Sequence, residues 1–187
     1  MVDLVDVVVE VEGDGEEQLG ASASAEAADW AARWWPQGRR VEVGRSREQA
    51  WAGAVAQVRR GLAVAVDYGH VLGDRAVFFD RRPTLTGYRD GRQVPPLPDG
   101  SCDLTAHVAL DALAAGSGGR VLSQREALLL LGVDATPPPR SLSTSDARGY
   151  LALLQRASQA AELLDRRTLG SFGWVVCPLG IEDPLLG

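Results

Sequence analysis

The sequence contains no lysine, so all 19 of its basic residues are arginines. It also contains only two cysteines and two histidines. Cys102 and Cys177 lie far apart and form no CxxC pattern, which favours free thiols in a reducing compartment over a disulfide framework. Two histidines and two separated cysteines give no metal-ligand spacing, so we expect no zinc site.

Long hydrophobic runs, a positive N-terminus and dense basic tracts are missing as well. No apolar stretch approaches the ~20 residues that cross a bilayer, and Asp3 and Asp6 stand where a signal peptide carries positive charge. The formal net charge of −6 argues against nucleic acid as the main partner. No G-x-S-x-G segment accompanies the histidines, which argues against a serine hydrolase. We therefore expect a soluble cytoplasmic protein that binds neither a membrane nor nucleic acid.

The composition is that of a folded α/β domain. The chain has 187 residues, 45% of them hydrophobic, and its 21 glycines and 10 prolines imply many turns. We expect a single domain over residues 1–187, with a small strand and helix segment at 1–44 and the main α/β portion at 45–180. Residue patterns predict strands at 4–11, 40–43, 62–66 and 172–177, and helices at 22–35, 46–61, 104–115, 123–132 and 145–164. The first two strands are expected to pair, and residues 71–100 read as a long irregular loop.

Local signals refine some of these helices. Two residue pairs have the spacing of a capping box, namely Ser46 with Gln49 and Ser123 with Glu126. Trp30 and Trp34 are expected to pack in the core, although three tryptophans so close together would also suit a stacking platform. The buried side of the 145–164 helix is expected to contain Tyr150, Leu153, Leu154 and Ala157.

The stretch from Gly61 to His70, GLAVAVDYGH, is the centre of the prediction. Its apolar run over residues 62–66 is typical of a strand that is buried on both faces inside a parallel sheet. Ligands of open α/β sheets bind beyond the carboxyl ends of the strands. Asp67, Tyr68 and Gly69 follow the run, so they stand where a site would form. The alternative is that Asp67 and Gly69 only make a loop, and a loop position is the default for His70.

His107 is the second candidate for chemistry. It is expected in the first turn of the 104–115 helix, with Asp103 or Thr105 as the N-cap. The helix dipole would favour its neutral imidazole, which could then accept a proton, and Asp103 could orient the ring. The alternative is that Asp103 and Thr105 only cap the helix and that His107 is a packing residue.

Three segments carry a resemblance to a known family: VDYGH at 66–70, TLTGYRDGRQVPPLPDGSCDLTAHVALDAL at 84–113 and SQREALLLLGV at 123–133. Their order and spacing resemble the C-terminal half of a family of S-adenosylmethionine (SAM)-dependent methyltransferases. That family includes the MidA-like mitochondrial arginine methyltransferase that assists complex I assembly. The resemblance covers roughly residues 40–177. The matching positions are Asp67, Tyr68, Gly69, Thr84, Leu85, Tyr88, residues 103–108, Gln124 and residues 128–132, with GSFGWVV at 170–176 similar to the family's last strand.

The resemblance implies a partial Rossmann-like class I methyltransferase fold, made of the C-terminal strands and helices. It implies S-adenosylmethionine as the cofactor and a protein side chain such as arginine as the methyl acceptor. The implied catalytic residues are His107, Asp67 and Tyr68. The implied substrate-binding residues are Gly69, His70, Tyr88, Asp103 and Thr105.

The sequence also departs from the family pattern. Ala109 and Leu110 stand where the family has an acid and an aromatic residue. The glycine-rich turn and the ribose-binding acid, which hold the cofactor in such folds, would lie before residue 1. A truncated gene product, a mis-set start and a real fragment all remain open, as does a non-catalytic partial domain that binds a partner. A sheet without its other half would expose an edge at residues 62–66, so we predict self-association through that edge.

Overall fold

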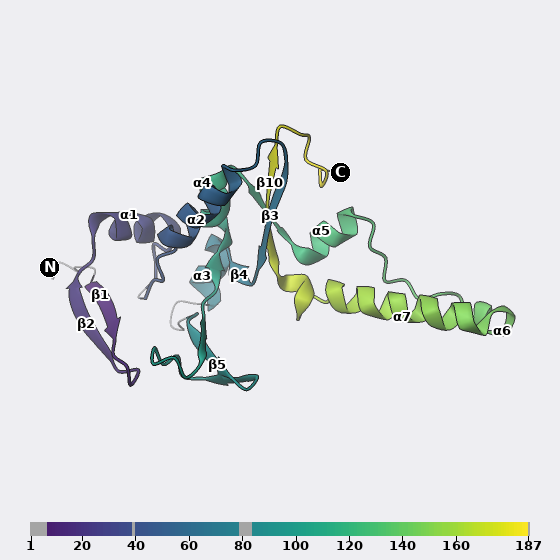
Figure 1. The fold of residues 1–187 in the computed structure, drawn as a ribbon, viewed down its shortest axis with the longest axis horizontal. Coiled ribbons are helices and arrows are strands. Elements are labelled where there is room, and N and C mark those ends of the chain that lie inside the picture. The colour runs from purple at the N-terminus through teal and green to yellow at the C-terminus, as the bar shows by residue number, and fades with distance from the viewer. Residues whose placement is uncertain (1–6, 39, 79–83, 187) are drawn as a thin grey trace. The chain divides into compact units, whose positions relative to one another are not determined.

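The computed structural model describes residues 7–38, 40–78 and 84–186 of the chain (Figure 1). The chain divides into two compact units. Unit 1 contains residues 1–47 and 70–112, and unit 2 contains residues 48–69 and 113–187. The chain alternates between the units, so each is built from two segments that are distant in sequence. The single-domain organisation stays a prediction.

The described residues of unit 1 form several short strands and helices. Its elements are β1 (Val7–Val11), β2 (Glu17–Ser22), α1 (Ala25–Trp34), α3 (Leu72–Phe78), β5 (Thr86–Arg89), β6 (Arg92–Val94), β7 (Asp103–Thr105) and β8 (Val108–Ala109). Three further elements contain the points at which the chain passes between the units: α2 (Arg45–Val55), β4 (Gly69–His70) and α4 (Leu110–Ser117).

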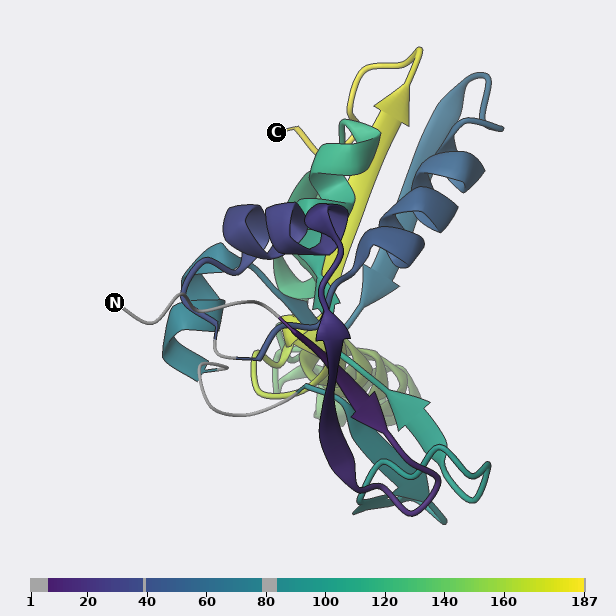
Figure 2. The same cartoon turned by 90° about the vertical axis from the view of Figure 1, so that its left-hand side faces the viewer.

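Among the described residues, the strands of unit 1 form a hairpin and a three-stranded sheet, and β8 pairs with β4. β1 and β2 pair antiparallel and lie side by side (Figure 2). The second sheet has the order β6-β5-β7, again antiparallel. β5 and β6 are joined by Asp90 and Gly91, whose φ angles are +52° and +71°. Two consecutive residues with positive φ are what a type I′ hairpin turn requires, and Asp-Gly is one of its preferred pairs.

The core of unit 1 is built from tryptophan and alanine. Trp30, Trp35, Ala109 and Ala112 form its buried cluster, against which Trp34 and Val41 pack. Helix α1 begins at an N-cap, because the hydroxyl of Ser24 accepts the backbone N–H of Ala27 at 3.2 Å. The prediction that Trp30 packs in the core is confirmed, and Trp34 lies partly buried beside it.

Unit 2 has a three-stranded antiparallel sheet in the order β3-β10-β9. Its elements are β3 (Gly61–Asp67), β9 (Arg120–Ser123), α5 (Gln124–Leu130), α6 (Leu142–Ser145), α7 (Ala147–Leu164), the 3-10 helix η1 (Leu169–Ser171) and β10 (Gly173–Leu179). β10 lies in the middle, with Val175 opposite both Ala65 and Val121. The core cluster contains Ala127, Val176 and Leu185, with Leu62, Val64, Leu122 and Trp174 packed against it.

Several predicted elements are confirmed with shifted ends. β1, β3 and β10 are the predicted strands at 4–11, 62–66 and 172–177, although residues 4–6 lie outside the described residues. α1, α5 and α7 are the predicted helices at 22–35, 123–132 and 145–164. The capping box of Ser123 and Glu126 is present in both directions. The positive φ of Gly132, +80°, follows the end of α5 as expected.

The environment predicted for the central strand is wrong. β3 runs antiparallel to β10, and among the described residues it pairs with β10 only. Residues 61–65 are half-buried, while Val66 is 46% exposed and Asp67 is exposed. β3 is therefore an edge strand among the described residues. One of its edges pairs with β10, and its other edge meets no described strand.

Four other local predictions are wrong. Residues 40–43 form no strand, and β1 pairs with β2 instead. Helix α2 begins at Arg45 and ends at Val55, so Ser46 lies inside the helix and not at its N-cap. The segment 71–100 is not an irregular loop, because it contains α3, β5 and β6. On α7 the predicted burial is wrong for Leu153 and Leu154, which are exposed, whereas Ala157 is buried as predicted and Tyr150 is half-buried.

In the described part of the chain, no helix combines the length and the hydropathy that spanning a bilayer requires.

Candidate functional site

The predicted site residues are divided between the two units. Unit 2 contains Asp67, Tyr68 and Gly69, and unit 1 contains His70, Tyr88, Asp103, Thr105 and His107. Within unit 1 the two histidine rings lie with their centroids 6.4 Å apart. The other three predicted residues of unit 1 meet on one sheet.

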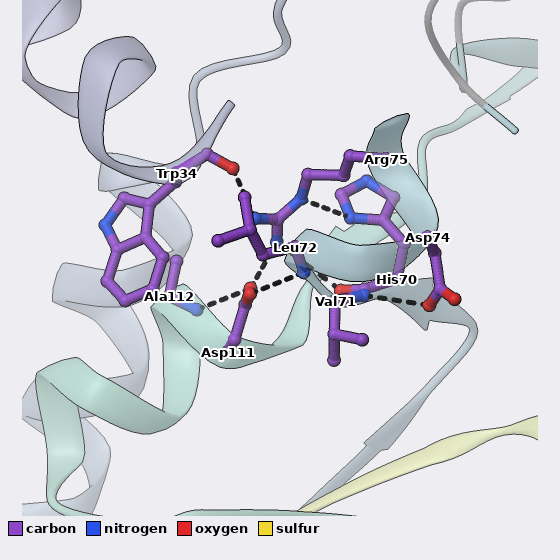
Figure 3. A network of polar contacts seen from close by, with 8 residues as sticks. All are labelled: Trp34, His70, Val71, Leu72, Asp74, Arg75, Asp111 and Ala112. Atoms are coloured by element: carbon purple, nitrogen blue, oxygen red, sulfur yellow. Dashed lines mark hydrogen bonds and ion pairs between the residues drawn. The ribbon is translucent and has the colours of Figure 1, made fainter. Parts of the chain in front are cut away.

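His70 lies in a buried polar network centred on Arg75 (Figure 3). Nε of Arg75 donates to Nδ1 of His70 at 2.9 Å. The two terminal nitrogens donate to the Trp34 carbonyl, to the Asp111 carboxylate and, at 3.5 Å, to the carbonyl of His70. Arg75 is only 1% exposed. A buried arginine is tolerated because its planar donors are paired with a carboxylate and with other acceptors.

Asp111 binds both the arginine and the start of helix α3. One of its oxygens pairs with Arg75, and the other accepts the backbone N–H of Leu72 at 2.7 Å. Asp74 accepts the backbone N–H of Val71 at 3.1 Å. These bonds satisfy backbone donors that the first turn of a helix leaves open, so α3 is tied to Asp111 by its N-terminus.

The environment keeps His70 neutral. Burial lowers the pKa of His70 to about 4, with further contributions from the positive charge of Arg75 and from His107. The carboxylates of Asp111 and Glu42 act in the opposite direction and do not prevail. Since Nδ1 accepts the hydrogen bond of Arg75, the neutral ring carries its proton on Nε2. The Trp35 ring packs edge-on against His70, with centroids 4.9 Å apart.

His107 is reached by a second polar chain, which begins at Glu42. Oε1 of Glu42 accepts the backbone N–H groups of Thr84, at 2.7 Å, and Leu85, at 3.1 Å. Oε2 accepts the hydroxyl of Thr84. The same hydroxyl accepts the backbone N–H of His107 at 3.1 Å. Glu42, Thr84 and His107 thus form a continuous path of hydrogen bonds inside unit 1.

The predicted position of His107 in a helix is wrong. Residues 103–105 are strand β7, 108–109 are β8, and helix α4 begins only at Leu110. Asp103 and Thr105 therefore cap no helix, and His107 gains nothing from a helix dipole. The cause is tertiary: β7 pairs with β5, and strand pairing prevails over the helical pattern of the sequence.

Tyr88, Asp103 and Thr105 instead share one face of the β6-β5-β7 sheet. Tyr88 lies opposite Asp103, and Thr86 lies opposite Thr105. Directly opposite residues, and residues two apart on one strand, point to the same face of a sheet. Asp103 is exposed and Tyr88 is 41% exposed. This face presents an aromatic ring and a carboxylate next to each other at the surface of unit 1.

Asp67 and Tyr68 lie at the end of β3, where Asp67 is opposite Gly173 of β10. Oδ1 of Asp67 accepts the backbone N–H of Tyr68 at 2.8 Å. The Tyr68 ring packs edge-on against Phe172, with centroids 6.0 Å apart. Asp67 is exposed at the end of β3.

The sequence reasoning missed Glu42, Arg75 and Asp111. Arg75 lay in the segment that reads as a loop, and buried arginines have no sequence signature because most arginines are exposed. Asp111 lay inside the predicted 104–115 helix without a predicted partner. One signal was available. Asp90-Gly91 is a typical hairpin turn, and it predicts the pairing of β5 and β6 in the sheet that contains Tyr88.

Within residues 7–38, 40–78 and 84–186, no group of three or more histidine, cysteine, aspartate and glutamate side chains is arranged to hold a metal ion.

Comparison with known proteins adds a family and a fold. Residues 3–120 match the model of a family described as "Putative S-adenosyl-L-methionine-dependent methyltransferase". None of the curated proteins is similar to the chain in sequence. Two crystal structures from Burkholderia thailandensis share its fold. One is of an uncharacterized protein, 23% identical, with a TM-score of 0.63 over 95% of this chain and 49% of that chain.

The second is of a protein described as a "likely methyl transferase" and bound to S-adenosyl-homocysteine. It is 23% identical, with a TM-score of 0.61 over 94% of this chain and 47% of that chain. The chain therefore spans about half the length of the solved structures that it matches.

Proposed function

The chain belongs to a family of S-adenosyl-L-methionine-dependent methyltransferases, and from this premise we propose that it takes part in methyl transfer to an arginine side chain of a protein. The family match over residues 3–120 is the observation that carries the proposal. The fold shared with a solved protein that binds S-adenosyl-homocysteine supports it. The MidA-like resemblance of the DLTAHV segment supports arginine as the acceptor.

The described residues fit the cofactor poorly. None of their strands leads into a helix through a G-x-G-x-x-G turn, the pattern that allows a backbone to approach a nucleotide cofactor. Asp67, an exposed acid at a strand end, matches only one part of such a site. We therefore assign no residue to the cofactor and derive no step through it. The proposal concerns the acceptor side of the reaction.

The paired side chains on the β6-β5-β7 sheet suit a guanidinium group. Tyr88 offers a ring face for a cation–π contact, and Asp103 opposite it offers a carboxylate for a bidentate ion pair. The formal net charge of −6 also favours a cationic substrate. Tyr88 and Asp103 would bind the acceptor arginine, with Thr105 on the same face.

His107 is the better of the two histidines for accepting the proton that a guanidinium nitrogen loses on methylation. His70, with a pKa of about 4, is too weak a base near pH 7, and its Nδ1 already accepts the hydrogen bond of Arg75. His70 would then act by packing beside His107. Asp67, Tyr68 and Gly69 remain candidates of unit 2, each to be tested by itself.

Transfer of a labelled methyl group tests the proposal. The full-length protein is incubated with tritiated S-adenosylmethionine and an arginine-containing peptide, and methylated arginine is identified after acid hydrolysis. We expect H107Q to lower kcat by about 100-fold or more, the scale of a lost general base. Y88A and D103N should raise KM and leave kcat nearly unchanged, because they remove binding that is equal in ground and transition states.

Glu16→Gln is the matched control, because Glu16 is exposed in the β1-β2 turn and lies outside the proposed site. The alternative is a non-catalytic domain that only binds a partner. Calorimetric titration distinguishes the two. No heat at millimolar S-adenosylmethionine, together with no transferred label, would rule out catalysis by this chain.

A further inference from the structure

We propose that Glu42 is a positioning residue for His107 and acts through the hydroxyl of Thr84. The role of Glu42 in catalysis rests on the proposed function, in which His107 is the general base. Neither Glu42 nor Thr84 would touch the substrate. They would determine where the backbone of His107 lies.

Three hydrogen bonds hold Thr84 and Leu85 to one carboxylate. Glu42 accepts two backbone N–H groups through Oε1 and the Thr84 hydroxyl through Oε2. Thr84 itself is only 6% exposed. A buried hydroxyl with both an acceptor and a donor beside it has little freedom to rotate, so its oxygen occupies a fixed place next to the chain at His107.

The carboxylate also fixes the direction of the hydrogen bonds. A hydroxyl has one proton, and a carboxylate can only accept, so the Thr84 proton points to Glu42. The lone pairs of the hydroxyl oxygen are then available for the N–H of His107. An amide at position 42 can instead donate to that oxygen, in which case the Thr84 proton has to find another acceptor. The arrangement therefore calls for an acid at position 42.

His107 needs such support because of its local structure. It lies in the two-residue connection between β7 and β8, outside any helix or strand. A helix would hold the position through its own backbone bonds, whereas here the backbone N–H of His107 donates to the Thr84 hydroxyl. A general base that moves by about 1 Å can lose much of its effect. Fixing the backbone at His107 is thus the use that we assign to Glu42 and the buried Thr84 hydroxyl.

Amide hydrogen exchange measures the proposed path without any assay of activity. The chain has only two histidines, so selective ¹⁵N-histidine labelling gives two backbone signals, which H107Q assigns. We expect T84V to accelerate exchange at His107 by about tenfold, the factor that corresponds to one lost hydrogen bond, and E42Q to accelerate it by a smaller factor, because the Thr84 hydroxyl stays but loses its fixed direction. T84S keeps the hydroxyl and should restore slow exchange. E16Q is the control, and the His70 amide is the internal reference.

Steady-state kinetics then tests whether Glu42 and Thr84 affect catalysis through His107. E42Q and T84V should lower kcat by about tenfold with KM unchanged, and T84S should recover most of the rate. Unchanged exchange at His107 in both E42Q and T84V overturns the inference, and so does faster exchange with an unaltered kcat. If the wild-type protein transfers no methyl group, the proposed function fails, and the exchange data alone still support or overturn the path from Glu42 to His107.

Discussion

Nε of Arg75 donates a hydrogen bond to Nδ1 of His70, 2.9 Å away, so a permanent cation lies against the imidazole in the interior of unit 1. A proton on Nδ1 would remove this bond and place two positive charges side by side. The pair is therefore stable only while His70 is neutral, which agrees with its pKa of about 4.

The first prediction is a loss of stability in acid that His70 causes. The unfolded chain protonates this histidine near pH 6.5, and the folded chain only near pH 4. Between these values the unfolded state binds more protons, so the free energy of unfolding falls as the pH falls, by at most about 1.4 kcal/mol per pH unit. Well above pH 6.5 His70 is neutral in both states, so it no longer makes the free energy of unfolding depend on pH.

Urea denaturation of the wild type and H70Q over this pH range measures the effect. Glutamine can still accept from Arg75, but it does not titrate. The difference between the two curves isolates His70 from the groups around it, which are Arg75, His107, Asp111 and Glu42. Equal pH dependence of both proteins would contradict the prediction.

The second prediction concerns the buried ion pair of Arg75 and Asp111. D111A leaves the guanidinium without its carboxylate and removes the acceptor of the Leu72 N–H. We expect a loss of about 3 kcal/mol in the free energy of unfolding, the scale of an uncompensated buried charge.

The control for D111A is the ion pair of Arg40 and Glu17 at the surface of the same unit. Nη1 of Arg40 lies 2.5 Å from Oε2 of Glu17. E17Q should cost less than about 1 kcal/mol, because solvent screens exposed charges. Similar losses for D111A and E17Q would show that burial does not strengthen the inner pair.

The third prediction compares two helix starts in unit 2. The Ser123 hydroxyl accepts the N–H of Glu126 at 3.2 Å, whereas Ser141 at the start of α6 makes no side-chain cap bond. S123A should therefore lower the free energy of unfolding by about 1 kcal/mol, and S141A should leave it unchanged. Urea denaturation at neutral pH measures both, and an equal effect of the two substitutions would refute the role of the cap.

Local signals explain which parts of the fold could be predicted. β3 was found because five apolar residues precede Asp67, and α5 because Ser123 and Glu126 have capping-box spacing. Residues 103–105 have a helical pattern in the sequence, and they form a strand because β5 lies beside them. The hairpin of β5 and β6 had its Asp90-Gly91 signal, but the surrounding prolines favoured a loop.

The candidate site shows the same division. The family resemblance named Tyr88, Asp103 and Thr105, and the structure shows that these three share a sheet face that was not expected. Arg75 could not be found, since its burial depends on acceptors from Trp34 and Asp111, which are distant in sequence, as well as on nearby His70. Residue types at one position do not show which distant groups will surround it.

The last prediction is self-association through the free edge of β3. Among the described residues this strand pairs with β10 only, and its apolar Val66 is 46% exposed. Unpaired strand edges with apolar side chains are sites of edge-to-edge pairing, and a charged residue there opposes it. V66K should therefore raise the dissociation constant of the oligomer by about tenfold or more, the effect of 1.4 kcal/mol per interface.

Sedimentation velocity over a concentration series measures this effect, and the location of the control makes the test specific. Leu151 on α7 is 64% exposed in the same unit, but it is on a helix and not part of the β3-β10-β9 sheet. L151K should leave the association unchanged if β3 is the interface. Dissociation by L151K and not by V66K would assign the contact to the exposed leucines of α7, which are Leu151, Leu153, Leu154 and Leu163. A wild-type chain that stays monomeric at all concentrations would refute the prediction.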